Sequence, residues 1–89
     1  MGTLTLNDGT VLQNSYGIIS SGVLFVYVGH NGSTIASVLN LFDDDEKTER
    51  IVYTQANGEN IVFLDYIKLI AVRDEGDGLF TAVLKRGNE

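Results

Sequence analysis

The sequence has no cysteine, no proline and no tryptophan among its 89 residues. Without cysteine, disulfides cannot staple the fold, and a single histidine leaves no zinc-ligand cluster. Burial must therefore supply the stability, and a hydrophobic content of 44% is sufficient for a small two-layer domain. We expect one domain, residues 1–89, for which self-association would add buried surface. Without proline, long strands can pair along their whole length.

Basic residues are also scarce: six lysines and arginines face twelve acids, for a formal charge of −6. Binding to nucleic acid or to anionic membranes usually leaves a basic patch, so this balance disfavours both and leaves room for a basic protein partner. No apolar run approaches the roughly 20 residues of a transmembrane helix. Residues 1–9 lack the basic region and long apolar stretch of a secretory signal, so cytoplasmic production is expected.

One segment has helical periodicity and looks like the element around which the chain is organised. Four large apolar side chains recur at i, i+3, i+4 and i+7: Ile35, Val38, Leu39 and Phe42. Ser33 can cap the start of this helix. The acidic run that follows Phe42 would oppose the negative end of the helix dipole, which predicts one short helix at about 33–42. Such a helix does not persist alone in water, so its apolar stripe must pack on a sheet.

The remaining sequence alternates strand-like runs with glycine-containing turns. Six runs have strand composition or alternation: 3–6, 10–19, 23–28, 50–54, 61–73 and 79–85. Asp8-Gly9 and Asn57-Gly58 are hairpin signatures. The run 23–28 is apolar at every position, which predicts a strand at the centre of the sheet, covered on both faces.

Two of these runs carry irregularities. In 10–19, Leu12, Tyr16 and Ile18 are expected on one face, and the polar middle suggests a bulge. In 61–73, Asp65 and Lys68 interrupt the pattern, so the inward face is expected to switch there through a bulge or bend.

Together these elements predict a mainly β fold, a β-rich α+β domain with six antiparallel strands in the order βββ-α-βββ. The sheet is expected to curl into a barrel-like roll, with the helix over an open end or face. The Asn-Asp-Gly at 7–9 and the Asn-Gly at 57–58 begin two loosely similar halves, which would be two three-stranded meanders joined by the helix. Shared composition explains this similarity equally well.

No catalytic, cofactor or metal site is predicted. The glycine-rich stretch 29–34 could bind an anion at a helix start, but it lacks the lysine of a phosphate-binding loop, and glycines with a cap explain it. His30 is the only histidine and has no evident catalytic companion in the sequence, so we interpret it as polar surface.

The candidate partner surface combines one acidic run with two tyrosines: Asp43, Asp44, Asp45, Glu46, Tyr27 and Tyr53. Neither this acidic run nor the one at 74–77 fits a calcium-binding loop. Both are interpreted first as solvated turns that protect strand edges, and alternatively as carboxylates that imitate a phosphate backbone. The tyrosines either pack at the boundary of the core or mark a partner surface, and the sequence does not separate the two.

The order of several short motifs resembles small uncharacterised proteins encoded in the structural-gene regions of phages and prophages of Gram-positive bacteria. These motifs are Leu-x-Leu-x-Asp-Gly-Thr at 4–10, Leu-Phe-Val-Tyr-Val at 24–28, Phe-Asp-Asp at 42–44, Lys-Thr at 47–48 and Asp-Tyr-Ile-Lys-Leu at 65–69. The resemblance implies a compact β-rich module of virion assembly or attachment, present in repeated copies. It implies no site residue.

We therefore expect a non-enzymatic structural or interaction protein, a phage tail or head–tail component that acts through protein–protein contacts and self-association. The alternative is an acidic phage-encoded inhibitor that binds a basic, nucleic-acid-handling host protein. No cofactor, nucleic acid or membrane is expected in either case.

Overall fold

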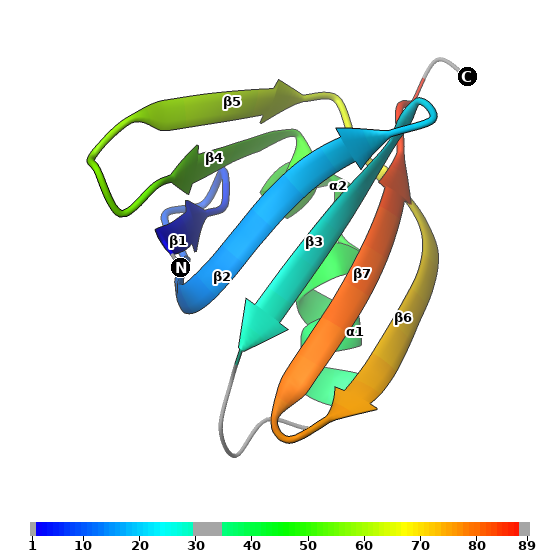
Figure 1. Cartoon of the computed structure of the whole chain (residues 1–89). Helices are drawn as coiled ribbons and strands as arrows, with labels where there is room; N and C mark the ends of the chain where they lie inside the picture. The colour runs from blue at the N-terminus through cyan, green and yellow to red at the C-terminus, as the bar shows by residue number, and fades with distance from the viewer. Residues whose placement is uncertain (1, 30–34, 88–89) are drawn as a thin grey trace.

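A computed structural model of the chain describes residues 2–29 and 35–87, except the side chain of Ile35. It contains seven strands and two short helices (Figure 1). The elements in chain order are β1 (Gly2–Thr5), β2 (Val11–Ser20), β3 (Val23–Gly29), α1 (Ile35–Phe42), α2 (Asp45–Thr48), β4 (Arg50–Thr54), β5 (Asn60–Leu64), β6 (Lys68–Gly76) and β7 (Leu79–Lys85). Residues 30–34, which include His30 and the predicted helix cap Ser33, lie outside the described residues.

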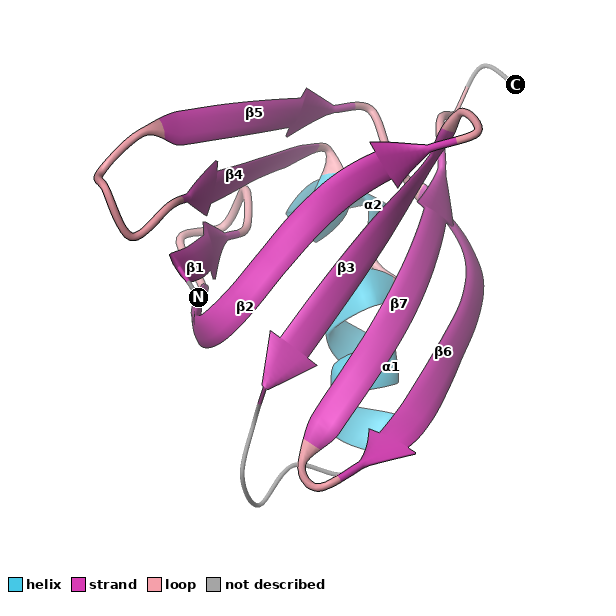
Figure 2. Ribbon diagram, in the orientation of Figure 1, coloured by secondary structure: helices cyan, strands magenta, loops and turns pink. Residues whose placement is uncertain are grey.

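All strands belong to one antiparallel sheet in the order β5-β4-β1-β2-β3-β7-β6 (Figure 2). The predicted mainly β class, with a curled antiparallel sheet and a short helix, is confirmed. The predicted count of six strands is wrong, because the run 61–73 is two strands, β5 and β6. The chain leaves β5 at Asp65, whose φ of 68° is left-handed. It is therefore a strand break that separates them, not a bulge in one strand.

The short connection after β5 shows how strongly the sheet curls. β5 and β6 lie at opposite edges of the sheet, yet only residues 65–67 join them. Since four residue steps span at most about 15 Å, the two edges approach each other at this end. The sheet is therefore a partly open roll, with the helices on its inner side (Figure 1).

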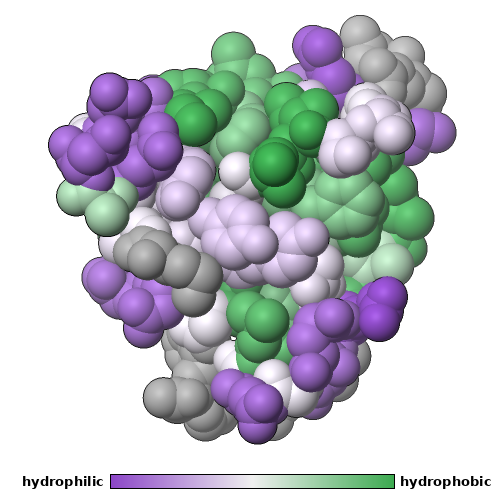
Figure 3. All heavy atoms as spheres, in the orientation of Figure 1, coloured by the Kyte–Doolittle hydropathy of each residue, from purple (hydrophilic) through white to green (hydrophobic). Residues whose placement is uncertain are grey.

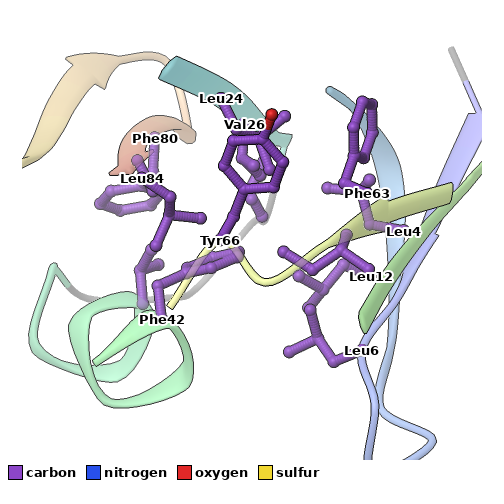
Figure 4. Packing of buried hydrophobic residues seen from close by; sticks show 14 residues of the cluster. Leu4, Leu6, Leu12, Leu24, Val26, Phe42, Phe63, Tyr66, Phe80 and Leu84 are labelled. Atoms are coloured by element: carbon purple, nitrogen blue, oxygen red, sulfur yellow. The ribbon is translucent and has the colours of Figure 1, made fainter. Parts of the chain in front are cut away.

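The core fills this inner side. Its buried apolar side chains come from β1 to β5, β7 and α1, together with two connecting segments (Figure 4). They are Leu4, Leu6, Leu12, Leu24, Val26, Val28, Val38, Phe42, Ile51, Phe63, Tyr66, Phe80, Ala82 and Leu84. Alternate residues of β3 and β7 supply the centre, as the pleat requires when one face of a sheet is covered.

The helix ends at Phe42 as predicted, but its buried face is rotated from the predicted stripe. Val38 and Phe42 are 2% and 0% exposed, whereas Leu39 is 42% exposed. Leu41 packs against the core in its place. Leu39 therefore does not anchor the helix, and the prediction that the stripe 35/38/39/42 faces the sheet is only partly correct.

The acidic run after α1 is not a plain turn. Asp44 is the N-cap of α2, and its Oδ1 accepts a hydrogen bond of 3.0 Å from the Glu46 N–H. A capping aspartate together with acids in the first turn stabilises a helix start, so the same charges that end α1 begin α2. Thr48, the last residue of α2, is fully buried.

β2 contains the predicted bulge. Asn14 has a φ of 51°, and the β1–β2 register shifts between Gly2 and Leu4. Leu12 faces inward, but beyond the bulge it is Ser15 and Gly17 that are buried. Tyr16 and Ile18 therefore face away from the core, which corrects the prediction that they share the face of Leu12.

Two further expectations are wrong. β3 lies inside the sheet, but β2 is the central strand. The inner positions of β3 are buried, whereas its outer positions, such as Phe25 and Tyr27, are only half-buried. Only one face of β3 is therefore fully covered. β1, β2 and β3 form a meander, but β4–β5 and β6–β7 are hairpins at opposite edges. The two halves are thus not equivalent meanders.

Candidate functional site

The outer face of the sheet, which is the face turned away from the helices, carries an apolar row across four strands. Ile18 pairs with Phe25, Phe25 with Val83, and Val83 with Ala71. Directly opposite residues share a face, so these four side chains form one continuous line, which we call the outer row. Ile18 is 52% exposed. In Figure 3, hydrophobic surface gathers on this face at the top of the view and along its right side.

A second line beside the outer row is aromatic. Tyr16 pairs with Tyr27, and their rings stack with centroids 4.5 Å apart. Tyr53 on β4 pairs with the buried Leu4 and packs against the core, and its ring centroid lies 6.4 Å from that of Tyr16, at the margin of this line. The predicted partner residues Tyr27 and Tyr53 therefore belong to one cluster, joined by Tyr16. Such a cluster, half-buried beside an apolar row, has the composition of protein–protein interfaces.

Thr81 continues this second line. It pairs with Tyr27 on one side and Arg73 on the other, and is 7% exposed. Among the described residues, its Oγ1 is a buried side-chain oxygen without a hydrogen-bond partner. A buried hydroxyl in this condition costs stability.

The β5 edge is a second surface. Hydrogen bonds join the Asp65 N–H to the Glu49 carbonyl at 2.8 Å, and the Gln55 N–H to the Glu59 carbonyl at 2.8 Å. Hydrogen-bonded pairs alternate in an antiparallel ladder. The backbone N–H and C=O groups of residues 59, 61, 63 and 65 therefore point toward β4. The N–H and C=O groups of Asn60, Val62 and Leu64 therefore point outward, and we call them the open edge.

The side chains along this edge are apolar and accessible. Ile61, Val62 and Leu64 are 41%, 43% and 55% exposed. Residues 60–64 contain no charge, whereas β6, at the other edge, carries Arg73, Asp74 and Glu75 and two register shifts. Charges and bulges protect an edge from pairing, so β6 is protected and β5 is not.

The acidic run lies on a different part of the molecule. Asp45 and Glu46 join Glu49, Asp65 and Ile67 around a pocket of about 140 Å³, which we call the acidic pocket. Asp43 is exposed outside this group, and Asp44 carries the α2 cap and lies 3.9 Å from Lys47 Nζ. The run 43–46 is thus divided, and it does not form one surface with Tyr27 and Tyr53.

The acidic pocket adjoins the end of β5, since Asp65 directly follows Leu64. Sequence reasoning missed Glu49 and Asp65 here. The one feature of the sequence that pointed to this region is that Glu59 and Asp65 flank an uncharged run.

Within the described ranges, no group of three or more His, Cys, Asp or Glu side chains is arranged to hold a metal ion. Neither described helix has the length and apolar character needed to cross a membrane. Comparison with protein-family models, with curated proteins and with solved structures found no match.

Proposed function

We propose that this domain is a non-enzymatic assembly module that associates with copies of itself through the outer face of its sheet. The observation that carries the proposal is the outer row, Ile18-Phe25-Val83-Ala71, which crosses four strands without a charge. Scattered exposed apolar residues are ordinary on a monomer, but a contiguous row beside aromatic side chains is characteristic of an interface.

A second copy is the favoured partner for this face because its centre is apolar and therefore self-complementary. In a two-fold dimer, the same patch contributes from both subunits. Two outer faces could pack as the sheets of a β-sandwich do, about 10 Å apart with interdigitating side chains. The resemblance to small proteins of phage structural-gene regions makes a repeated virion assembly the proposed setting.

Cysteine labelling tests the proposal cleanly, since the chain has no cysteine of its own. Ile18→Cys places a thiol on the outer row, and Leu39→Cys places one at a similarly exposed position on α1. Alkylation of the thiol at position 18 should slow as protein concentration rises, whereas the rate at position 39 should stay constant. Equal, concentration-independent rates at both positions would reject association through this face.

The acidic inhibitor is a second candidate, and the acidic pocket favours it. Four carboxylates surround that pocket: Asp45, Glu46, Glu49 and Asp65. An inhibitor would bind a basic protein through these groups, and its affinity would fall with salt. Neutralising Asp45 and Glu46 together as Asn and Gln, with Asp74→Asn as the remote control, should then weaken binding selectively.

A further inference from the structure

The open edge of β5 offers backbone hydrogen-bonding groups that nothing in the described residues uses. Asn60, Val62 and Leu64 direct their N–H and C=O groups away from β4, and β5 ends the sheet. In other proteins, an extended segment that adds to such an edge gains main-chain hydrogen bonds, with side-chain contacts to both faces. Here Val62 and Leu64 would contact one face of an added strand, and Ile61 the other.

The charges at the two ends of β5 distinguish the kinds of strand that could pair with the open edge. A two-fold pairing of β5 with its own copy, centred on Val62, would place Glu59 opposite Asp65 of the second copy. Like charges directly opposite each other destabilise a strand pair, and each subunit carries a formal charge of −6. This register, which is the one that pairs all three outward positions of both copies, is therefore disfavoured for a second copy.

An antiparallel strand with basic ends fits instead. Its first residue would lie beside Asp65 and the acidic pocket, and its last beside Glu59. The aliphatic stem of a lysine or arginine could lie on Ile67 while its charge meets the carboxylates. Within the described part of the chain, Asp45, Glu46, Glu49 and Asp65 form no ion pair that would compete.

We infer that the β5 edge binds an extended, largely apolar segment of a partner protein, with a basic residue at each end, by strand addition. The inference rests on the proposed role as an interaction module. It adds a second surface, separate from the outer row, and the chemistry of its partner.

Synthetic peptides test it directly by fluorescence anisotropy. The probe is the labelled peptide Lys-Val-Thr-Val-Thr-Val-Lys, which places valines beside Leu64 and Val62, and the control carries glutamate at both ends. The basic peptide should bind about tenfold or more tightly than the acidic one, with affinity that falls as salt rises. Equal binding of the two peptides would overturn the assigned charge preference.

Backbone N-methylation of the peptide distinguishes strand addition from non-specific binding. Two further peptides carry N-methyl groups at alternate residues, one in each phase. An added strand turns only one phase toward β5, so one methylated peptide should lose binding and the other should keep most of it. Loss in neither phase, or equal loss in both, would overturn strand addition.

On the protein side, Val62→Pro removes an outward N–H that β4 does not use, and Val62→Thr keeps that N–H. Binding should fall about tenfold in the proline variant and change little in the threonine variant. Asp65→Asn should weaken binding of the basic peptide, whereas Asp74→Asn on the protected edge should leave that binding unchanged.

The two proposals fail independently. Ile18→Lys on the outer row should abolish self-association and leave peptide binding intact, and Val62→Pro should do the reverse. If the protein self-associates but does not bind the peptide, only the strand-addition inference is overturned. If the protein binds the peptide but remains a monomer, only the outer-face proposal is overturned.

Discussion

Gly17 on β2 lies against the ring of Phe63 on β5, so that a Cβ built at Gly17 would stand 3.0 Å from Phe63 Cε2. Two strands, β4 and β1, separate β2 from β5 in the sheet. The contact therefore crosses the inside of the curl. Because residue 17 has no side chain, Phe63 can enter the roll and become 5% exposed.

Gly17→Val should destabilise the fold by about 1–3 kcal/mol, because the added methyls must displace a buried ring. Urea unfolding measures this change in the free energy of unfolding. Combining Gly17→Val with Phe63→Leu should cost less than the sum of the single changes, because both act on one contact. Strict additivity would show that the ring does not limit residue 17.

Helix α1 should depend on Phe42 and not on Leu39. Phe42 is fully buried, so Phe42→Ala should cost about 3–5 kcal/mol. Leu39 is 42% exposed, and Leu39→Ala should cost about 1 kcal/mol or less. Chemical denaturation of the two variants side by side checks the order, and equal costs would contradict the observed orientation of the helix.

Thr81→Val should stabilise the protein by on the order of 1 kcal/mol. Its Oγ1 is buried without a hydrogen-bond partner, and valine keeps the shape while it removes the unsatisfied oxygen. Thr81→Ser is the matched control, because it keeps the hydroxyl and loses the methyl, and it should not stabilise. Thermal unfolding distinguishes them, and a less stable valine variant would reveal a hydrogen bond to Oγ1.

The Asp8 turn predicts a pH dependence. A hydrogen bond from the Thr10 N–H, 3.0 Å from Asp8 Oδ1, lowers the pKa of this carboxyl below its ordinary 3.8. A carboxyl with a lowered pKa in the folded state stabilises that state above its unfolded pKa. The contribution is present above pH 3.8 and disappears as the pH falls through the folded-state pKa.

A carbon-detected NMR titration of the Asp8 carboxyl should therefore show a midpoint below 3.8. In Asp8→Asn this part of the pH dependence of unfolding should be absent. A midpoint at or above the ordinary value would mean that the turn does not hold the charged form in solution.

The fold class and hairpins could be predicted from the sequence because local chemistry determines them. Asp8-Gly9 and Asn57-Gly58 occupy the turns that they predict, and Gly9 and Gly58 have φ values of 92° and 88°. The strand break at Asp65 could not be predicted in this way. It depends on a left-handed aspartate and on the placement of β6 at the far edge, which is a tertiary choice.

The candidate site was less accessible to sequence reasoning. Helical periodicity defines a stripe but not its centre, so Leu39 was placed inward. The meeting of Tyr27 and Tyr53 at Tyr16 depends on strand register, and the exposure of β5 depends on strand order. The α2 cap was readable, since an aspartate before further acids and Lys47 is a helix-start signal.

Light scattering behind size-exclusion chromatography, over a hundredfold range of protein concentration and at low and high salt, tests the central claim most directly. The account predicts that the wild-type chain forms a discrete oligomer whose molar mass is insensitive to salt, because apolar contacts hold it together. Ile18→Lys should give a monomer, and Leu39→Lys, at a similarly exposed position on α1, should leave the oligomer intact. A wild-type chain that remains a monomer throughout would contradict the claim.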